Sequence, residues 1–160
     1  MNVKQGSLDV IDLRLLTCLQ RDAALSQRDL ANQLGISQNA CWRRLHALQS
    51  AGILAGSQAR VDLAFLGLDL TIYVMIQTRE HSKDWSETFK RRVQSLPEVV
   101  DVHRIGGEWD YMLRVVTAGM QGYDRFYQKL IDGLAFNKVT GLFSMERIME
   151  NRPVDLNRLL

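Results

Sequence analysis

Basic and amide side chains gather between residues 37 and 50, a stretch without any acidic residue. At about 100° per residue, a helix over this stretch brings Asn39, Arg43 and His46 to one face. An arginine there can pair with a guanine edge or hold a phosphate, and an amide can pair with adenine. The opposite face is apolar and consists of Cys41, Leu45 and Leu48. These residue types in this pattern predict a helix that enters the major groove of double-stranded DNA.

The predicted DNA contacts of this helix are Ser37, Gln38, Asn39, Trp42, Arg43, Arg44 and His46. Gln38 and Asn39 stand at its N-terminal end, which contacts the bases in a helix-turn-helix. Two alternatives stay open: the arginines form a solvated basic face, and the amides only complete the first helical turn. Trp42 lies on the flank of the helix, where it either packs beside the first helix or covers a sugar-phosphate strand.

Three helices are predicted in the first third of the chain, because apolar residues recur there at spacings of three and four. The first helix has its apolar positions between Leu8 and Leu19. Ser26, with Asp29 three residues later, caps the second helix, and Gly35 ends it. Ser37 caps the third. Two short helices separated by a few residues that include glycine are typical of a helix-turn-helix.

The second half of the chain follows a different pattern, in which β-branched and aromatic residues predict strands. The expected elements are a strand over 70–78, a helix over 82–96, strands over 99–105 and 111–116, a helix over 120–134 and a strand over 139–149. This βαββαβ order is typical of a ferredoxin-like sheet with both helices on one face. The other face needs a cover, and a second copy of the sheet supplies it, so we predict a homodimer.

The predicted fold class is therefore α+β. An N-terminal helix-turn-helix (winged-helix-like) domain covers residues 1–56, and a C-terminal ferredoxin-like βαββαβ domain covers residues 69–160. Residues 57–68 form a linker that can hold a strand. Residues 1–60 carry seven Lys or Arg against four Asp, whereas residues 61–160 carry thirteen against fourteen acidic residues. The excess of positive charge thus lies in the domain that is expected to meet a polyanion.

Other classes of protein lack their usual signals here. No apolar run approaches the roughly 20 residues of a membrane-spanning helix, and the first residues lack the apolar core of a secretory signal, so we expect a cytoplasmic protein. Cys18 and Cys41 have no metal-ligand or redox spacing and are expected to be reduced packing residues. No nucleophile elbow, phosphate loop or metal-binding histidine motif is present. We therefore predict no enzyme activity, no catalytic residue and no metal.

Four segments, in order along nearly the whole chain, resemble the Lrp/AsnC family of leucine-responsive or feast/famine regulators. Residues 8–16 resemble the first helix of that family, and residues 30–37 and 43–54 resemble its helix-turn-helix. The most specific segment is Gly106-Gly107-Glu108-Trp109-Asp110-Tyr111, which is similar to the family's Gly-x-x-Asp-Tyr turn. The chain departs from the family at residues 133–137, where the usual Pro-Gly before the last strand is missing.

The resemblance implies a transcriptional regulator that binds DNA and responds to a small amino acid, with no other cofactor. It also implies a homodimer that assembles into tetramers or octamers, with the amino acid bound between dimers. The residues leave one alternative open, an amino-acid-sensing assembly protein whose helical domain binds a protein partner. The acid-free third helix favours DNA over that alternative.

An amino-acid effector presents a carboxylate and an ammonium group close together. The amides of Gly106 and Gly107 can approach the carboxylate because glycine has no Cβ, and Asp110 can bind the ammonium. By resemblance, the facing wall belongs to a neighbouring dimer, and the predicted effector residues are Gly106, Gly107, Asp110, Leu130, Gly141, Phe143 and Ser144. Gly141 inside a strand also indicates that some group approaches the backbone closely. The structural alternatives are an ordinary tight hairpin at the glycines and a turn-capping carboxylate at Asp110.

Overall fold

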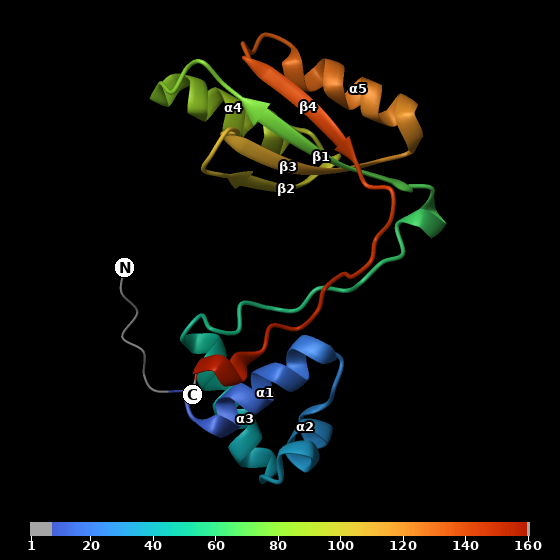
Figure 1. Ribbon diagram of the computed structural model, residues 1–160. Coiled ribbons are helices and arrows are strands. Elements are labelled where there is room, and N and C mark those ends of the chain that lie inside the picture. The colour runs from blue at the N-terminus through green and yellow to red at the C-terminus, as the bar shows by residue number, and fades with distance from the viewer. Residues whose placement is uncertain (1–7, 160) are drawn as a thin grey trace. The chain divides into compact units, whose positions relative to one another are not determined.

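The computed structural model describes residues 8–159, which fall into two compact units (Figure 1). The first unit comprises residues 8–60 together with residues 149–159, and the second comprises residues 61–148. Each unit has its own hydrophobic core. No helix among the described residues is long and apolar enough to cross a membrane.

The helical unit contains α1 (Val10–Arg21), α2 (Gln27–Leu34) and α3 (Gln38–Ser50), close to the predicted bounds. Only residues 35–37 separate α2 from α3. The buried side chains that hold the helices together are Leu15, Leu16, Leu30, Ala31, Leu34, Cys41 and Leu48. The short turn between two packed helices confirms the predicted helix-turn-helix.

Polar side chains fix where each of these helices begins. Asp9 caps α1 in a capping box, and Ser26 and Ser37 cap α2 and α3; each side chain accepts a hydrogen bond from the amide three residues later. Gly35 ends α2 at φ 67°, a left-handed conformation that costs glycine little because it has no Cβ. The predicted boundaries at Ser26, Gly35 and Ser37 are therefore confirmed.

The linker between the two units holds no strand among the described residues. After α3 the chain runs to a single 3₁₀ turn, η1 (Ala64–Leu66), and then to the first strand of the sheet. A strand needs a hydrogen-bonded neighbour, and the sheet of the described chain consists of four other strands. The strand that residues 57–68 were expected to be able to hold is therefore absent from this single chain.

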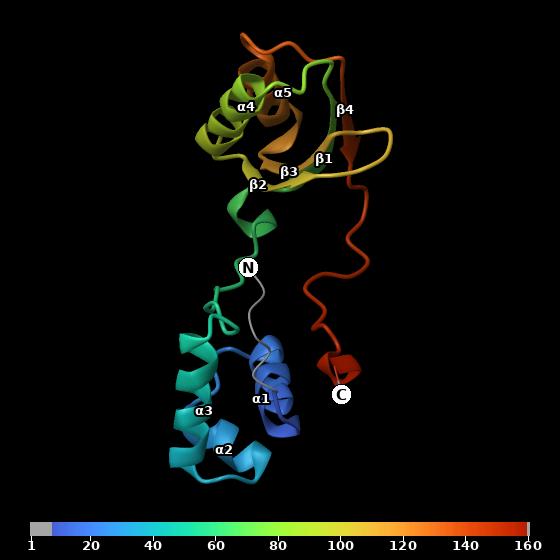
Figure 2. The same ribbon diagram turned by 90° about the vertical axis from the view of Figure 1, so that its left-hand side faces the viewer.

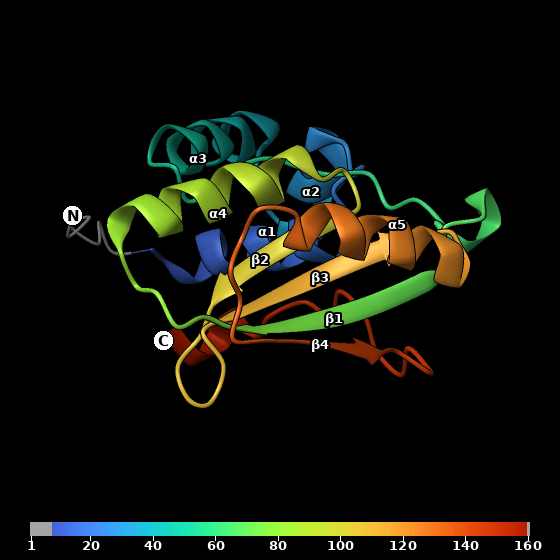
Figure 3. The same ribbon diagram turned by 90° about the horizontal axis from the view of Figure 1, so that it is seen from above.

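The second unit is a four-stranded antiparallel sheet with two helices on one face (Figure 3). Its elements follow in the order β1 (Leu70–Gln77), α4 (Lys83–Ser95), β2 (Val99–Arg104), β3 (Tyr111–Thr117), α5 (Gly119–Ile131) and β4 (Lys138–Phe143). The strands are arranged β2-β3-β1-β4, with each neighbouring pair antiparallel. This is the predicted βαββαβ ferredoxin-like order, so the α+β class is confirmed.

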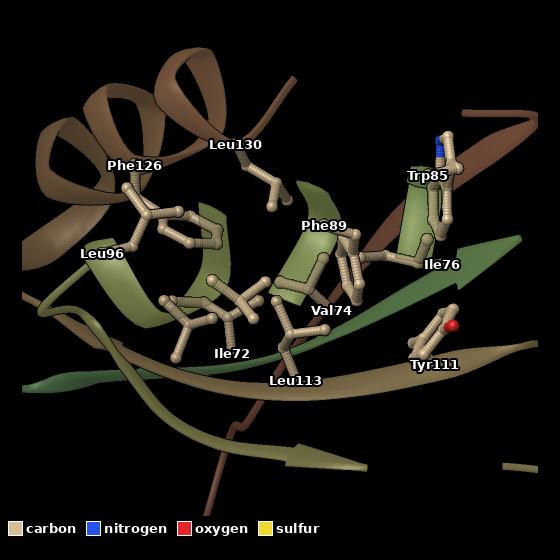
Figure 4. Close-up of a cluster of buried hydrophobic side chains, with 12 residues drawn as sticks. Ile72, Val74, Ile76, Trp85, Phe89, Leu96, Tyr111, Leu113, Phe126 and Leu130 are labelled. Carbon is tan, nitrogen blue, oxygen red and sulfur yellow. The ribbon is translucent and has the colours of Figure 1, made fainter. Parts of the chain in front are cut away.

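The residues of β1 alternate between the two faces of the sheet. Ile72, Val74 and Ile76 are fully buried and share one core with Phe89 of α4 and Phe126 of α5 (Figure 4). Burying a large apolar side chain contributes about 1.5–3 kcal/mol, so this layer of side chains is the main source of stability for the unit.

The opposite face of the sheet is partly apolar, and both helices of the unit lie away from it. Tyr73 of β1 pairs across the ladder with Leu142 of β4, next to Met75. On the other side of β1, toward β3 and β2, Arg114 of β3 binds Asp101 of β2, with 2.5 Å between Nε and Oδ2. This is the face for which the sequence predicts a second copy of the chain, and the homodimer stays a prediction.

β4 ends at Phe143, before the predicted end at Met149. The amide of Ser144 still donates to the carbonyl of Thr71. Because β1 begins at Leu70, only that one residue of β1 remains beyond the pair of Thr71 and Ser144. The geometry of the neighbouring strand therefore ends β4, although the residues that follow are rich in apolar side chains.

The end of the chain packs with the helices. Residues 149–159 cluster with the helical unit, and a final 3₁₀ turn, η2 (Leu156–Leu159), contacts α1 (Figure 2). The domain predicted over residues 69–160 thus contributes its last residues to the contacts of the helical unit. There the amide of Val154 donates to Gln20 Oε1 of α1 at 2.8 Å, and Leu156 packs against the helical core.

Gly141 allows α5 to pack closely on β4. A Cβ at this position would stand 2.5 Å from the hydroxyl oxygen of Tyr123 and 3.1 Å from its Cζ atom. The close approach that a glycine within a strand indicates is therefore made by Tyr123 of the same chain. Tyr123 also meets Phe143 edge-on, with ring centroids 5.3 Å apart, and burial raises the pKa of its hydroxyl.

The substitution Gly141→Ala should destabilise the sheet unit by about 1–3 kcal/mol, the usual result of forcing an extra methyl group into a packed site. Gly106→Ala is the matched control, because no atom lies within 4 Å of a Cβ added there. Urea unfolding of both variants measures the difference. Equal midpoints would show that Tyr123 moves aside without cost and would contradict this account of Gly141.

Candidate DNA-binding face and effector turn

The face of α3 that is predicted to contact DNA is open to solvent. Gln38, Asn39, Arg43 and His46 are all exposed, and so is the capping residue Ser37. No ion pair to Arg43 occurs within residues 8–159. The Arg43 guanidinium is therefore available to an external anion.

Arg44 points to the start of α1 instead. Its Nη1 donates to Asp9 Oδ2 and to Asp12 Oδ1, each at 2.7 Å. Hydrogen bonds to Asp12 and Asp9 raise the pKa of Arg44. The backbone amide of Asp12 and the Arg44 side chain together lower the pKa of Asp9. The two neighbouring arginines thus have different surroundings, although the sequence analysis treated them alike.

The Arg44 ion pairs fix the position of α3 on α1. A guanidinium that already binds two carboxylates is a weak candidate for a phosphate clamp, since DNA would have to compete with both partners. This contact was not predicted, because the partners lie 32 and 35 positions away along the chain. The available signal was the pair of carboxylates, Asp9 and Asp12, at the start of the first predicted helix, where negative charge suits the helix dipole.

Trp42 lies on the surface rather than in the core. Its side chain is 52% exposed and stacks on His46, with ring centroids 5.4 Å apart and planes 29° from parallel. The two rings lie four positions apart, one above the other on the same side of α3. Of the two alternatives for Trp42, packing beside the first helix is therefore wrong, and contact with a sugar-phosphate strand stays a prediction.

The predicted effector turn joins β2 to β3. Gly107 adopts φ 114°, a conformation that side chains rarely allow. The amide of Thr78 donates to Asp110 Oδ2 at 2.8 Å, and the backbone amide of Asp110 donates to the Ile76 carbonyl. One carboxylate oxygen of Asp110 thus has a turn-anchoring role, which was the structural alternative for this residue.

Further contacts that the sequence analysis missed hold the same turn. The side-chain amide of Gln77 donates to the Glu108 carbonyl at 3.1 Å. Lys138 lies with its Nζ 4.8 Å from the ring centroid of Trp109 and 4.0 Å from the Glu108 carboxylate. Residues from β1 and from the start of β4 therefore support the turn, and periodicity along the chain gives no sign of such contacts.

The remaining predicted effector residues lie elsewhere in the unit. Leu130 is fully buried in the core (Figure 4), so its side chain offers no surface to a ligand. Phe143 pairs with Ile72 at one end of β1, and Ser144 follows it, whereas the turn is bound to Ile76 near the other end. A single chain does not bring these two groups of residues together.

Both cysteines are free thiols in the helical unit. Cys41 is fully buried in the core, and this burial raises the pKa of its thiol. Cys18 is half-buried and packs against the same core. Within the described part of the chain, no group of three or more His, Cys, Asp or Glu residues is placed to hold a metal ion.

Two family models match this chain. The first, described as "Winged helix-turn-helix DNA-binding", matches residues 8–55. The second, described as "Lrp/AsnC ligand binding domain", matches residues 71–154. The first match contains the three helices, and the second contains the four strands except for the first residue of β1.

Similar proteins are known from sequence and from structure. The "DNA-binding transcriptional activator DecR" of Escherichia coli (strain K12) is 42% identical over 142 residues, which are 88% of this chain and 93% of that protein. The "Glutamate uptake regulatory protein" of Zymomonas mobilis is 37% identical over 141 residues, 88% of this chain and 86% of that protein.

Among solved structures, an AsnC family transcriptional regulator from Agrobacterium tumefaciens superposes with a TM-score of 0.90 at 34% identity. A transcriptional regulator from Neisseria meningitidis, solved as a complex with L-Met, superposes with a TM-score of 0.91 at 28% identity. Each comparison covers 96% of this chain and 100% of the other.

Replacing Arg44 should lower stability, whereas replacing Arg43 should not. Arg44→Ala removes two short ion pairs, and because the guanidinium is partly exposed we expect a loss of about 1 kcal/mol. Arg43→Ala, at an exposed position, should stay within about 0.5 kcal/mol of the parent. Urea unfolding of the two variants at neutral pH measures this difference.

The contribution of the Arg44 pairs should also depend on pH. The pKa of Asp9 is lowered in the folded chain, so its contribution is complete above the unfolded value of about 3.9 and disappears as pH falls below it. The difference between parent and Arg44→Ala should therefore shrink below about pH 4. A difference that stays constant from pH 7 to pH 3 would contradict the pairing.

Proposed function

We propose a mechanism that starts from the membership of this chain in the Lrp/AsnC family. In this mechanism α3 recognises DNA, and a small amino acid at the effector turn modulates that binding. The family consists of DNA-binding transcriptional regulators with a ligand-binding effector domain, so the chain is a regulator and not an enzyme. The alternative of a partner-binding assembly protein is set aside, because residues 8–55 match a DNA-binding family. We place the protein in the cytoplasm, where its DNA lies.

The exposed, acid-free face of α3 is the observation that carries the DNA-binding part of the proposal. Gln38 and Asn39 lie in the first turn of the helix, where side chains meet base edges in this motif. Arg43 is exposed one turn further on and is the arginine that we assign to guanine or phosphate. Trp42 and His46 stack beside it and are proposed to cover the sugar-phosphate strand.

The effector part of the proposal places the amino acid on the Gly106–Asp110 turn. The amides of the two glycines bind the carboxylate, and Asp110 keeps an oxygen for the ammonium while the other anchors Thr78. Because Phe143 and Ser144 lie at the other end of β1, a second copy of the chain must supply that wall. The L-Met complex of the similar Neisseria regulator supports an amino acid as the ligand.

The assembly that we propose begins with a homodimer. The open face of the sheet carries Tyr73, Met75 and Leu142, a partly apolar surface that a second sheet would cover. Dimers then assemble into tetramers or octamers, as the family resemblance implies, and the effector lies between dimers. An isologous dimer also presents two copies of α3, which suits an operator with two-fold symmetry.

Arg43→Ala should weaken binding to an operator fragment selected with the parent protein by about 10-fold, since one good base or phosphate contact contributes about 1–3 kcal/mol. Arg125→Ala, at another exposed arginine on α5, is the matched control and should bind like the parent. Fluorescence anisotropy over a range of salt concentrations gives both affinity and salt slope. Equal affinities for the three proteins would show that α3 reads DNA in another register.

Asp110→Asn should abolish the response to the effector while preserving the fold. The asparagine oxygen can still accept the hydrogen bond from Thr78, but the charge that binds the ammonium is lost. A thermal-shift screen of the twenty amino acids identifies the effector, because a ligand of the folded state raises its melting temperature. Asp124→Asn, at an exposed residue of α5, is the control, and unchanged affinity of Asp110→Asn for the effector would move the site elsewhere.

A further inference from the structure

The turn between β2 and β3 contains two adjacent glycines whose amides are open. Neither the Gly106 amide nor the Gly107 amide donates a hydrogen bond within residues 8–159. No atom lies within 4 Å of a Cβ added at either position, and glycine has the widest choice of backbone conformations. The two amides that are proposed to bind the effector carboxylate therefore need other contacts to keep them in one arrangement.

Gln77 of β1 restrains the backbone beside these glycines. Its side-chain Nε2 donates to the carbonyl oxygen of Glu108 at 3.1 Å. This carbonyl belongs to the residue that follows Gly107, which has φ 114°. The end of the turn has a separate anchor, because Asp110 is bound to β1 as described above. The Gln77 side chain thus holds the part of the turn that the Asp110 contacts leave free.

Two further side chains hold Gln77. Its Oε1 accepts from Asn137 Nδ2 at 2.6 Å, and Asn137 Oδ1 accepts from Arg79 Nε at 2.7 Å. The backbone amide of Asn137 also donates to the carbonyl of Gln77 at 2.8 Å. One continuous series of hydrogen bonds therefore runs from Arg79, which follows β1, through Asn137, which precedes β4, to Gln77 and the Glu108 carbonyl.

The direction of this series is fixed at both of its ends. A guanidinium can only donate, so Asn137 must turn its oxygen to Arg79 and its NH₂ group to Gln77. A carbonyl can only accept, so Gln77 must turn its NH₂ group to Glu108 and its oxygen to Asn137. Both ends impose the same orientation on the two amides, and neither amide can turn over without losing two hydrogen bonds.

We propose that Gln77 is a positioning residue for the effector, and that Arg79 and Asn137 keep its amide in the orientation that holds the turn. This inference rests on the proposed function, because that function assigns the effector to the Gly106–Asp110 turn. A loop that is already held in its bound conformation binds more tightly, since it loses less conformational entropy when the ligand arrives. Gln77 supplies this restraint beside two glycines that cannot supply it themselves.

Gln77→Met tests the anchor, because methionine has a similar size and no hydrogen-bond donor. Isothermal titration calorimetry uses the amino acid that raises the melting temperature of the parent most in the thermal-shift screen. We expect its dissociation constant to rise by about 5-fold, the usual effect of one net hydrogen bond. The effector-free melting temperature and operator affinity should stay near those of the parent. Gln128→Met, at an exposed glutamine of α5, is the control.

Asn137→Asp tests the orientation of the Gln77 amide. The new carboxylate still accepts from Arg79, now as an ion pair, but it cannot donate to Gln77. The Gln77 NH₂ group then turns toward this carboxylate and away from Glu108. We expect effector affinity to fall by about 5-fold, while the effector-free melting temperature stays at or above that of the parent.

A double variant separates this orientation effect from simple charge repulsion. If Asn137 acts through Gln77, then Gln77→Met combined with Asn137→Asp should lose about 5-fold in total, because the two changes remove the same contact. Repulsion between the new carboxylate and the effector does not need Gln77, so it would multiply the two losses to about 25-fold.

The proposal is overturned if Gln77→Met binds the amino acid as tightly as the parent, or if the losses of the double variant multiply. A lower effector-free melting temperature of Gln77→Met with unchanged effector affinity would show a purely structural role and would also overturn it. A parent protein that responds to no amino acid overturns the proposed function itself. That result appears before any variant is compared.

Discussion

The ion pairs that Arg44 of α3 forms with the start of α1 are the interaction on which the proposed mechanism depends. Arg44 binds Asp9 and Asp12 at the start of α1, so α3 is held by two ion pairs as well as by its apolar face. These ion pairs turn Arg44 toward α1, whereas Arg43 stays exposed and is the arginine that we propose contacts DNA. A recognition helix must be rigid if its side chains are to meet base edges, and in the proposed mechanism rigidity and recognition are divided between adjacent residues.

The sheet unit places a second constraint on function. Its helices cover one face, and its proposed effector residues lie at opposite ends of β1. A single chain therefore leaves one face of the sheet uncovered and does not bring the proposed effector residues together. The second copy of the chain that we propose would meet both needs, and for that reason we expect oligomerisation and effector binding to depend on each other.

Local patterns in the sequence were enough to predict the helices, the strands and their order. The caps at Ser26 and Ser37 and the alternation of Ile72, Val74 and Ile76 depend on neighbours within a few residues. The contacts that sequence reasoning missed join distant residues: Arg44 with Asp12, Asp110 with Thr78, and Gln20 with Val154. Such contacts depend on how the elements pack, and periodicity carries no information about that. For the same reason, the buried position of Leu130 and the early end of β4 at Phe143 became visible only in the structure.

The central claim is that this chain binds specific DNA and that an amino acid changes this binding. The most direct measurement is an in vitro selection of genomic fragments by the purified protein, carried out with and without a mixture of the twenty amino acids. The account predicts enrichment of a sequence with two-fold symmetry and half-sites about 10 base pairs or a multiple apart, with a yield that changes when the amino acids are present. Fragments no more enriched than random DNA, in both conditions, would contradict it.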